Sequence, residues 1–327
     1  MSYRFKLCEP VAAGVRRIAA EQFDMAEGRL ASANDMALAI HDVRRCLKRL
    51  RALLRLIRPA LPKGDYARET ERLSGIGRLL AGARDLEVIG QTLAKLRNRG
   101  NGLSKDTADA LQSLLAANRA RNGADPRKEA LARLKAARRV LTGAAIAGVT
   151  FHDLVAGLEK SYAQARRRLR RARDAPSDER LHAWRKAVQW HWRHVQLLSH
   201  GWPEAMSAHA GEAKELSRLL GEDHDYAVLL AFARRQGRGV MARKELHSLA
   251  ALCKSAQAEL RAAAAPRGQR LFAETAESLT ARVDRYWNSA VSLACLAAPA
   301  PAAPPRGERP RRPPPKRPAR IAAAQRR

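Results

Sequence analysis

The chain has 327 residues, and its 62 Lys and Arg outnumber its 32 Asp and Glu, which gives a formal net charge of +30. Hydrophobic residues make up 46% of the chain but aromatic residues only 5%, so any core must be mainly aliphatic and alanine. This composition argues against a mostly disordered chain and fits one large or two mid-sized domains. The charge predicts a polyanionic partner: nucleic acid, an anionic membrane or polyphosphate.

Cysteine usage and hydropathy favour a soluble, cytoplasmic protein. The four cysteines are far apart and form no CxxC pair, which argues against a disulfide framework or a zinc site. The N-terminal residues lack a continuous apolar segment, so no signal peptide is expected. The longest uncharged run, 286–305, is interrupted by prolines, which is unsuitable for a membrane helix.

Helical periodicity extends through almost the whole chain, and good helix formers dominate it, so we predict an all-α fold of roughly ten helices. Asn34-Asp35 and Ser177-Asp178-Glu179 are typical of helix starts. The last segment, 297–327, has nine Lys or Arg, one Glu and nine of the 16 prolines, which predicts a disordered basic tail. In chain order, breaks between helices are expected at 59–64, 98–102, 122–126, 174–177 and 201–203.

A pattern repeats within the chain. The first copy reads HDVRRCLKRLR (41–51) and then LLAGARDLEVI (79–89), and the second reads HAWRKAVQ (182–189) and then LLGEDHDYAVL (219–229). The histidine that opens each copy precedes the aspartate after the Leu-Leu pair by 44 positions in the first copy and 43 in the second. We therefore predict a duplication that gives two pseudo-symmetric helical halves, about 1–149 and 150–296.

Each copy contains a helix with one cationic face and one apolar face. At 100° per residue, the polar residues of the first helix lie within an arc of roughly 120° and form a stripe about 20 Å long. They are His41, Arg44, Arg45, Lys48, Arg51 and Arg55, and Val43, Leu47, Leu50, Leu54 and Ile57 lie opposite. The second helix places His182, Arg185, Lys186, Gln189, Arg193, Gln196 and His200 on one face and Trp184, Val188, Val195 and Leu198 on the other.

A solvated surface is the ordinary explanation of a polar helix face, but solvated faces interleave both signs of charge. Asp42 is the only acid between His41 and Arg58. Arginine also suits phosphoryl oxygens, because its planar fork can bind two of them at once. The stripes therefore favour a bound anion.

These segments, together with LFAET and RYW near 271–287, resemble the CHAD domain, the conserved-histidine α-helical domain. The resemblance covers about 5–290, so we expect one CHAD domain over 1–296. It implies two helical bundles around a basic cleft or pore that binds inorganic polyphosphate, and association with polyphosphate granules. We expect this binding to involve no catalysis, metal or cofactor.

The resemblance nominates His41, Arg44, Lys48, Arg49 and Arg51 in the first copy and His182, Arg185, Lys186 and Arg193 in the second. Arg45, Arg55 and Gln189 on the same faces complete the predicted polyphosphate site. Gln189 stands where a lysine is common in the family, and Trp190 and Trp192 replace basic positions. For the two histidines, hydrogen bonding to phosphate and a structural role at the bundle centre both remain open.

Residues in these segments also allow other functional interpretations. His-Asp pairs at 41–42 and 152–153, and the acidic 222–225, resemble metal phosphohydrolase motifs, but a dication beside the arginines would be repelled. Trp184, Trp190 and Trp192, with His191 and His194, are candidate base-stacking residues for an alternative nucleic-acid-binding function. Arg166 and Arg170 either extend the second cationic face or belong to a solvated run. No P-loop, nucleophile elbow or paired-carboxylate motif indicates an enzyme.

Overall fold

The computed structural model describes residues 3–100, 102–121, 126–143 and 146–297. As predicted, this part of the chain is all-α, with eleven α-helices and no strand. The helices are α1 (Val11–Ala31), α2 (Met36–Leu56), α3 (Asp65–Leu79), α4 (Ala81–Asn98), α5 (Lys105–Arg121), α6 (Arg127–Leu141), α7 (Phe151–Asp174), α8 (Asp178–Leu197), α9 (Pro203–Gln236), α10 (Arg243–Leu271) and α11 (Ala276–Ala297). The 3₁₀ turns η1 (Arg58–Ala60) and η3 (Ser199–Gly201) follow α2 and α8.

Both predicted helix starts are confirmed by their caps. The Asp35 carboxylate accepts hydrogen bonds from the backbone N–H groups of Ala37 and Leu38, and the Ser177 hydroxyl accepts one from that of Arg180. These bonds satisfy backbone donors that have no partner inside the helix. The predicted break at 122–126 and the predicted basic tail lie outside the described residues, apart from Pro126 and from Ala297 at the end of α11.

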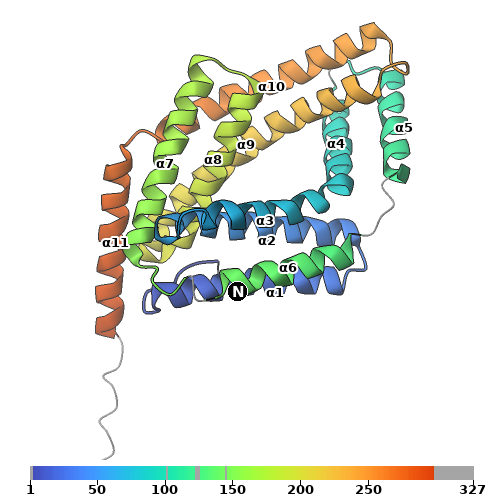
Figure 1. Ribbon diagram of the computed structural model, residues 1–327. Coiled ribbons are helices and arrows are strands. Elements are labelled where there is room, and N and C mark those ends of the chain that lie inside the picture. Colours follow the sequence, from blue (N-terminus) through green and yellow to red (C-terminus); the bar gives the residue numbers. More distant parts are fainter. Residues whose placement is uncertain (1–2, 101, 122–125, 144–145, 298–327) are drawn as a thin grey trace, which may run out of the picture.

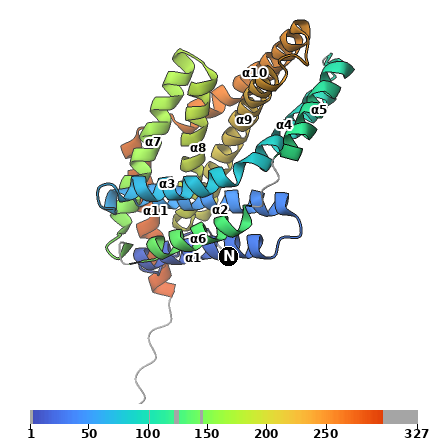
Figure 2. The same ribbon diagram turned by 45° about the vertical axis from the view of Figure 1, so that its right-hand side comes forward.

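The helices form a lower group and an upper group, seen in Figure 1. Helices α1, α2, α3 and α6 run side by side in the lower group, while α7, α8, α9 and α10 rise from it. The hairpins α4–α5 and α9–α10 project together on one side, as the rotated view in Figure 2 also shows. Helix α2 packs against both α7 and α8, so the two groups meet along its length.

Burial follows the predicted apolar faces. Every apolar residue predicted for the inner faces of α2 and α8 is at most 3% exposed, including Trp184. These side chains belong to one core shared by the lower group and by α7, α8, α9 and α11, and a second core joins α4 and α5 to the far parts of α9 and α10. Because large aliphatic side chains gain most from leaving water, this burial fixes which faces of α2 and α8 remain available. No helix in the described ranges is long and apolar enough to cross a membrane.

Candidate functional site

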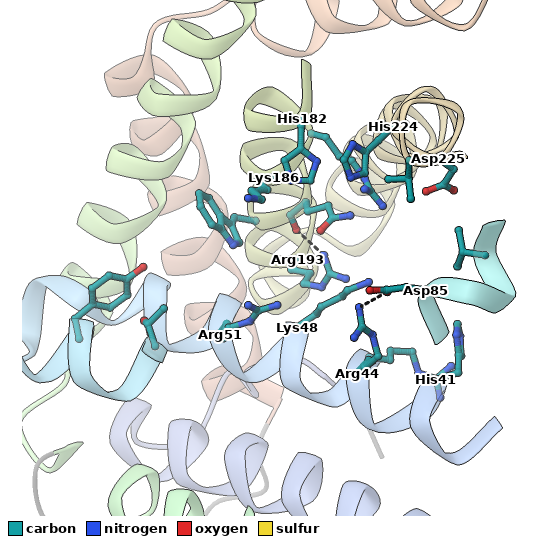
Figure 3. A pocket seen from close by; sticks show the side chains of 18 residues that line it. His41, Arg44, Lys48, Arg51, Asp85, His182, Lys186, Arg193, His224 and Asp225 are labelled. Atoms are coloured by element: carbon teal, nitrogen blue, oxygen red, sulfur yellow. Dashed lines mark hydrogen bonds and ion pairs between the residues drawn. The ribbon is translucent and has the colours of Figure 1, made fainter. Parts of the chain in front are cut away.

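A pocket of about 670 Å³ opens where α2 faces α8, with α3, α4 and α9 closing its sides (Figure 3). Lys48 and Arg51 point upward from α2 toward Lys186 and Arg193 of α8 in this view, and Asp85 and Asp225 lie at the right. The lining consists of His41, Arg44, Arg45, Lys48, Arg51, Tyr66, Thr70, Asp85, Val88, His182, Arg185, Lys186, Gln189, Trp190, Arg193, His224, Asp225 and Val228. Residues far apart in sequence thus share one cavity.

Ten of the twelve predicted site residues line this pocket, and Arg49 and Arg55 do not. Arg49 lies over the Tyr3 ring, 5.1 Å from its centroid, and donates to the Gln22 side chain at 3.2 Å. Arg55 lies 3.8 Å from the centroid of the Trp190 ring and donates to the Tyr66 hydroxyl at 2.9 Å. Arg49 therefore has a packing role, whereas Arg55 supports two aromatic residues of the lining.

The pocket contains far more positive than negative charge. Seven lining residues are Lys or Arg and two are Asp. The carboxylate of Asp85 is 3.8 Å from Arg44 and 58% exposed, so this pair is loose. The following five lining cations make no ion pair within the described ranges: Lys48, Arg51, Arg185, Lys186 and Arg193. This deficit of carboxylates favours an anionic ligand.

Several buried polar atoms of the lining also lack hydrogen-bond partners within the described chain. They are Nε of Arg185, Nε of Arg193 and Nδ1 of His182. Arg193 uses another guanidinium nitrogen to donate to the Gln189 backbone oxygen at 2.8 Å. Buried donors are normally paired, because leaving one unpaired costs about 1–3 kcal/mol. Oxygen acceptors on a ligand would satisfy the guanidinium donors.

Burial and repulsion between like charges lower the pKa values of cations that line the pocket. Burial, followed by the charges of Arg193, Arg185, Arg44 and Arg51, lowers the pKa of Lys48 from 10.5 to about 8. Burial is also the main cause that lowers the pKa of Arg193 to about 10. A lowered pKa of a basic group means that the fold disfavours its charge. The pocket therefore gathers positive charges that the fold itself disfavours.

The two pocket histidines of the upper group stack on each other. The ring centroids of His182 and His224 are 3.9 Å apart. Burial and then the charge of Lys186 lower the pKa of His182 to about 4, and burial and then His182 lower the pKa of His224 to about 4. Both rings are therefore neutral at pH 7, and each offers one N–H donor rather than a positive charge.

Three carboxylates of the His-Asp segments have structural partners. Asp42 lies 3.1 Å from Arg29 and 3.2 Å from Arg45, and Asp153 forms the capping box of α7 with Thr150. Asp223 pairs with Arg261 at 2.6 Å. No group of three or more His, Cys, Asp or Glu suited to a metal ion occurs among the described residues. Asp42 and Asp223 thus join neighbouring helices, and Asp153 caps the start of α7.

The proposed base-stacking histidines are buried in the interior. His194 bonds through Nδ1 to the Ser161 hydroxyl at 2.8 Å and through Nε2 to the Ala52 backbone oxygen at 2.9 Å. His191 bonds to His209 at 2.8 Å between their Nε2 atoms. Neither ring is accessible to a base, so this part of the nucleic-acid interpretation is wrong. Of the three tryptophans considered, only Trp190 lines the pocket.

Eight lining residues were not among the predicted site residues: Tyr66, Thr70, Asp85, Val88, Trp190, His224, Asp225 and Val228. Trp190 and His224 lie in segments noted in the sequence, but as candidates for other roles. Tyr66 and Thr70 lie outside both repeated segments, and only the packing of α3 against α2 brings them to the pocket. Asp85 and Asp225, in contrast, occupy corresponding places in the two repeats.

The buried histidines predict acid lability. Burial lowers the pKa of His194 to about 3 and that of His191 well below 6.5, in addition to His182 and His224. In the unfolded chain these groups take up protons near pH 6.5, whereas in the fold they do not. Their contribution to stability is thus complete above pH 6.5 and is lost as the pH falls toward 4. Each of these histidines lowers the free energy of unfolding by about 1.4 kcal/mol for every pH unit by which the pH falls within that window.

We therefore expect the free energy of unfolding to fall by several kcal/mol between about pH 7 and pH 5.5, a range in which ordinary carboxylates stay ionised. Urea unfolding followed by far-UV circular dichroism at both pH values measures this loss. An unchanged midpoint would show that the histidines protonate without opening the fold.

Part of the sequence matches a known protein family. The model of the CHAD domain matches residues 17–234, a span that includes every lining residue of the pocket. No curated protein matches the chain. Since the matched span is more than half of the sequence, the chain belongs to the CHAD domain family.

Proposed function

We propose that this protein binds inorganic polyphosphate, without catalysis, in the pocket between α2 and α8. The observation that supports this most strongly is the convergence of seven Lys and Arg residues on one cavity that has two carboxylates. A linear chain of phosphates presents closely spaced anionic oxygens that satisfy cations from both helices at once. Family membership supports the same ligand class, and polyphosphate granules are the proposed cellular location.

The lining suits a phosphate chain better than a nucleic acid. Single-stranded nucleic acids gain affinity when bases stack on exposed aromatic faces. The indole of Trp190 is instead occupied by Arg55, whose guanidinium carbon lies 3.8 Å from the ring centroid. One face of the Tyr66 ring is covered by Arg58, whose guanidinium carbon lies 4.7 Å from the ring centroid. The accessible groups are mainly cations, which recognise phosphate rather than base.

We further propose that the pocket is the cleft between two duplicated halves of a domain that extends over 1–296. Helices α2 and α8 support this. Each begins a few residues before the histidine of its repeat, and each is followed by a 3₁₀ turn, η1 or η3. In this interpretation each copy contributes one cationic face, so the ligand contacts both copies. The missing lysine at Gln189 is offset by Lys186 and Arg193 on the same helix.

Competition binding tests the ligand class. Labelled long-chain polyphosphate bound to the full chain at about 150 mM salt is challenged with RNA and with DNA of matched total charge. We expect nucleic acid to compete at least tenfold less well than unlabelled polyphosphate, because the pocket offers few stacking faces. Equal competition by RNA would overturn the proposal and identify nucleic acid as the ligand.

A further inference from the structure

The arginine run of α7 lies beside the pocket, and its members have different environments. Arg166 donates to the backbone oxygen of Phe272 at 3.1 Å, and so faces away from the pocket and does not extend the second cationic face. Arg168 donates to the backbone oxygen of Ala183 on α8 at 2.7 Å and lies 5.7 Å from the centroid of the Trp190 ring. Arg168 therefore joins α7 to the pocket wall.

Arg171 and Arg167 adjoin Arg168 on the helix surface. Residues three apart share a helix face, which places Arg171 one turn beyond Arg168, with Arg167 on the flank. Both Arg167 and Arg171 are exposed, and neither makes an ion pair within the described ranges. We call Arg167, Arg168 and Arg171 the α7 arginine row. In Figure 1 the C-terminal half of α7 lies alongside the N-terminal half of α8, which carries the pocket residues Arg185 and Lys186.

The electrostatic effects of neighbouring residues connect this row to the pocket. Burial, followed by the charges of Arg168, Arg51 and Arg185, lowers the pKa of the exposed Lys186 at the pocket edge. Burial, followed by the charges of Arg55, Arg167 and Arg171, lowers the pKa of Arg168. Positive charges thus continue from Lys186 through Arg168 to the outer arginines. Like charges at this spacing repel one another unless an anion lies between them.

We propose that a polyphosphate chain longer than the pocket leaves it past Lys186 and binds the α7 arginine row as a second contact region, so that affinity rises with chain length. This inference rests on the proposed function. The pocket holds one part of the polymer, and the tethered remainder reaches the row at a high effective concentration. A short phosphate ligand such as tripolyphosphate fills the pocket alone and gains nothing from the row.

The test compares R167Q/R171Q with R234Q/R235Q. The control pair removes the same charge from exposed helix positions that make no ion pair within the described ranges, about 14 Å along α9 beyond Asp225. Arg168 is left intact because it packs against Trp190. We expect R167Q/R171Q to bind long-chain polyphosphate on the order of tenfold more weakly and to reduce the slope of log affinity against log salt by roughly 1.4. Its affinity for tripolyphosphate should stay within about twofold of wild type, and the control should change either affinity by less than about twofold.

Two results separate the failure of this inference from the failure of the proposed function. If R167Q/R171Q and R234Q/R235Q weaken long-chain binding equally, the row is a solvated surface and the inference is overturned. If removing the pocket cations Lys48 and Arg185 leaves both long-chain and tripolyphosphate binding unchanged, the pocket is not the site, and the proposed function itself fails.

Discussion

Replacing Lys48 and Arg185 by methionine should weaken polyphosphate binding at least about a hundredfold while it stabilises the free protein. Both side chains line the pocket, and neither makes an ion pair within the described ranges. Phosphate oxygens would contact them in a partly desolvated setting, where the loss of one charged contact costs about 2–5 kcal/mol of binding. Methionine keeps the length and helix propensity of these side chains but removes the charge.

The expected gain in stability follows from the direction in which the fold shifts the pKa of Lys48. Lys48 titrates at about 8 in the fold and at 10.5 in the unfolded chain, so its charge destabilises the fold by about 3 kcal/mol at pH 7. That penalty is complete below pH 8 and disappears as the pH rises to 10.5. Removing the charge by K48M removes the penalty, so the melting temperature of the free variant should rise.

Isothermal titration with long-chain polyphosphate and thermal melts with and without ligand measure both effects. The wild-type melting temperature should rise when ligand is added, because a ligand that binds only the folded state stabilises it, and K48M/R185M should lose most of that rise. R234M/R235M is the matched control and should bind as wild type does. An affinity within about threefold of wild type in K48M/R185M would exclude the pocket as the binding site.

The two cationic helix faces were predictable because helix geometry fixes which residues share a face. The apolar residues of the first helix, such as Val43 and Leu50, are all buried in the core. The cationic face on the opposite side of the helix therefore points away from that core. Arg49, which the family resemblance nominated, does not line the pocket, because it is adjacent to Lys48 in sequence but turned by about 100° around the helix. There it meets Tyr3 from a segment that precedes α1.

What the sequence did not predict depends on packing between distant segments. The Leu-Leu pair of the first repeat stands at the end of α3, and α4 begins directly after it. Leu219 and Leu220 instead lie inside α9, which continues without interruption past Asp225. The two segments have similar sequences, but the second is a single helix packed along α8 and α10, and so places His224 beside His182.

The close crossing of α2 and α7 gives the largest expected effect on stability. A Cβ atom added to Gly157 of α7 would lie 1.8 Å from the backbone oxygen of Leu56 and 2.7 Å from its carbonyl carbon. Both atoms belong to the backbone at the end of α2, which no rotamer change can move aside. G157A should therefore force the helices apart and lower the free energy of unfolding by at least about 3 kcal/mol.

Gly211 provides the matched control. It lies within α9, and a Cβ atom there would meet no atom within 4 Å. G211A should therefore stabilise the protein by up to about 1 kcal/mol, because alanine is the better helix former. Urea unfolding of both variants measures the difference, and equal midpoints would show that the α2–α7 crossing can widen freely. Because α7 also packs against α8, a separation of α2 from α7 shifts the two cationic faces relative to each other. Folded G157A should accordingly bind polyphosphate more weakly than G211A, although every pocket side chain is retained.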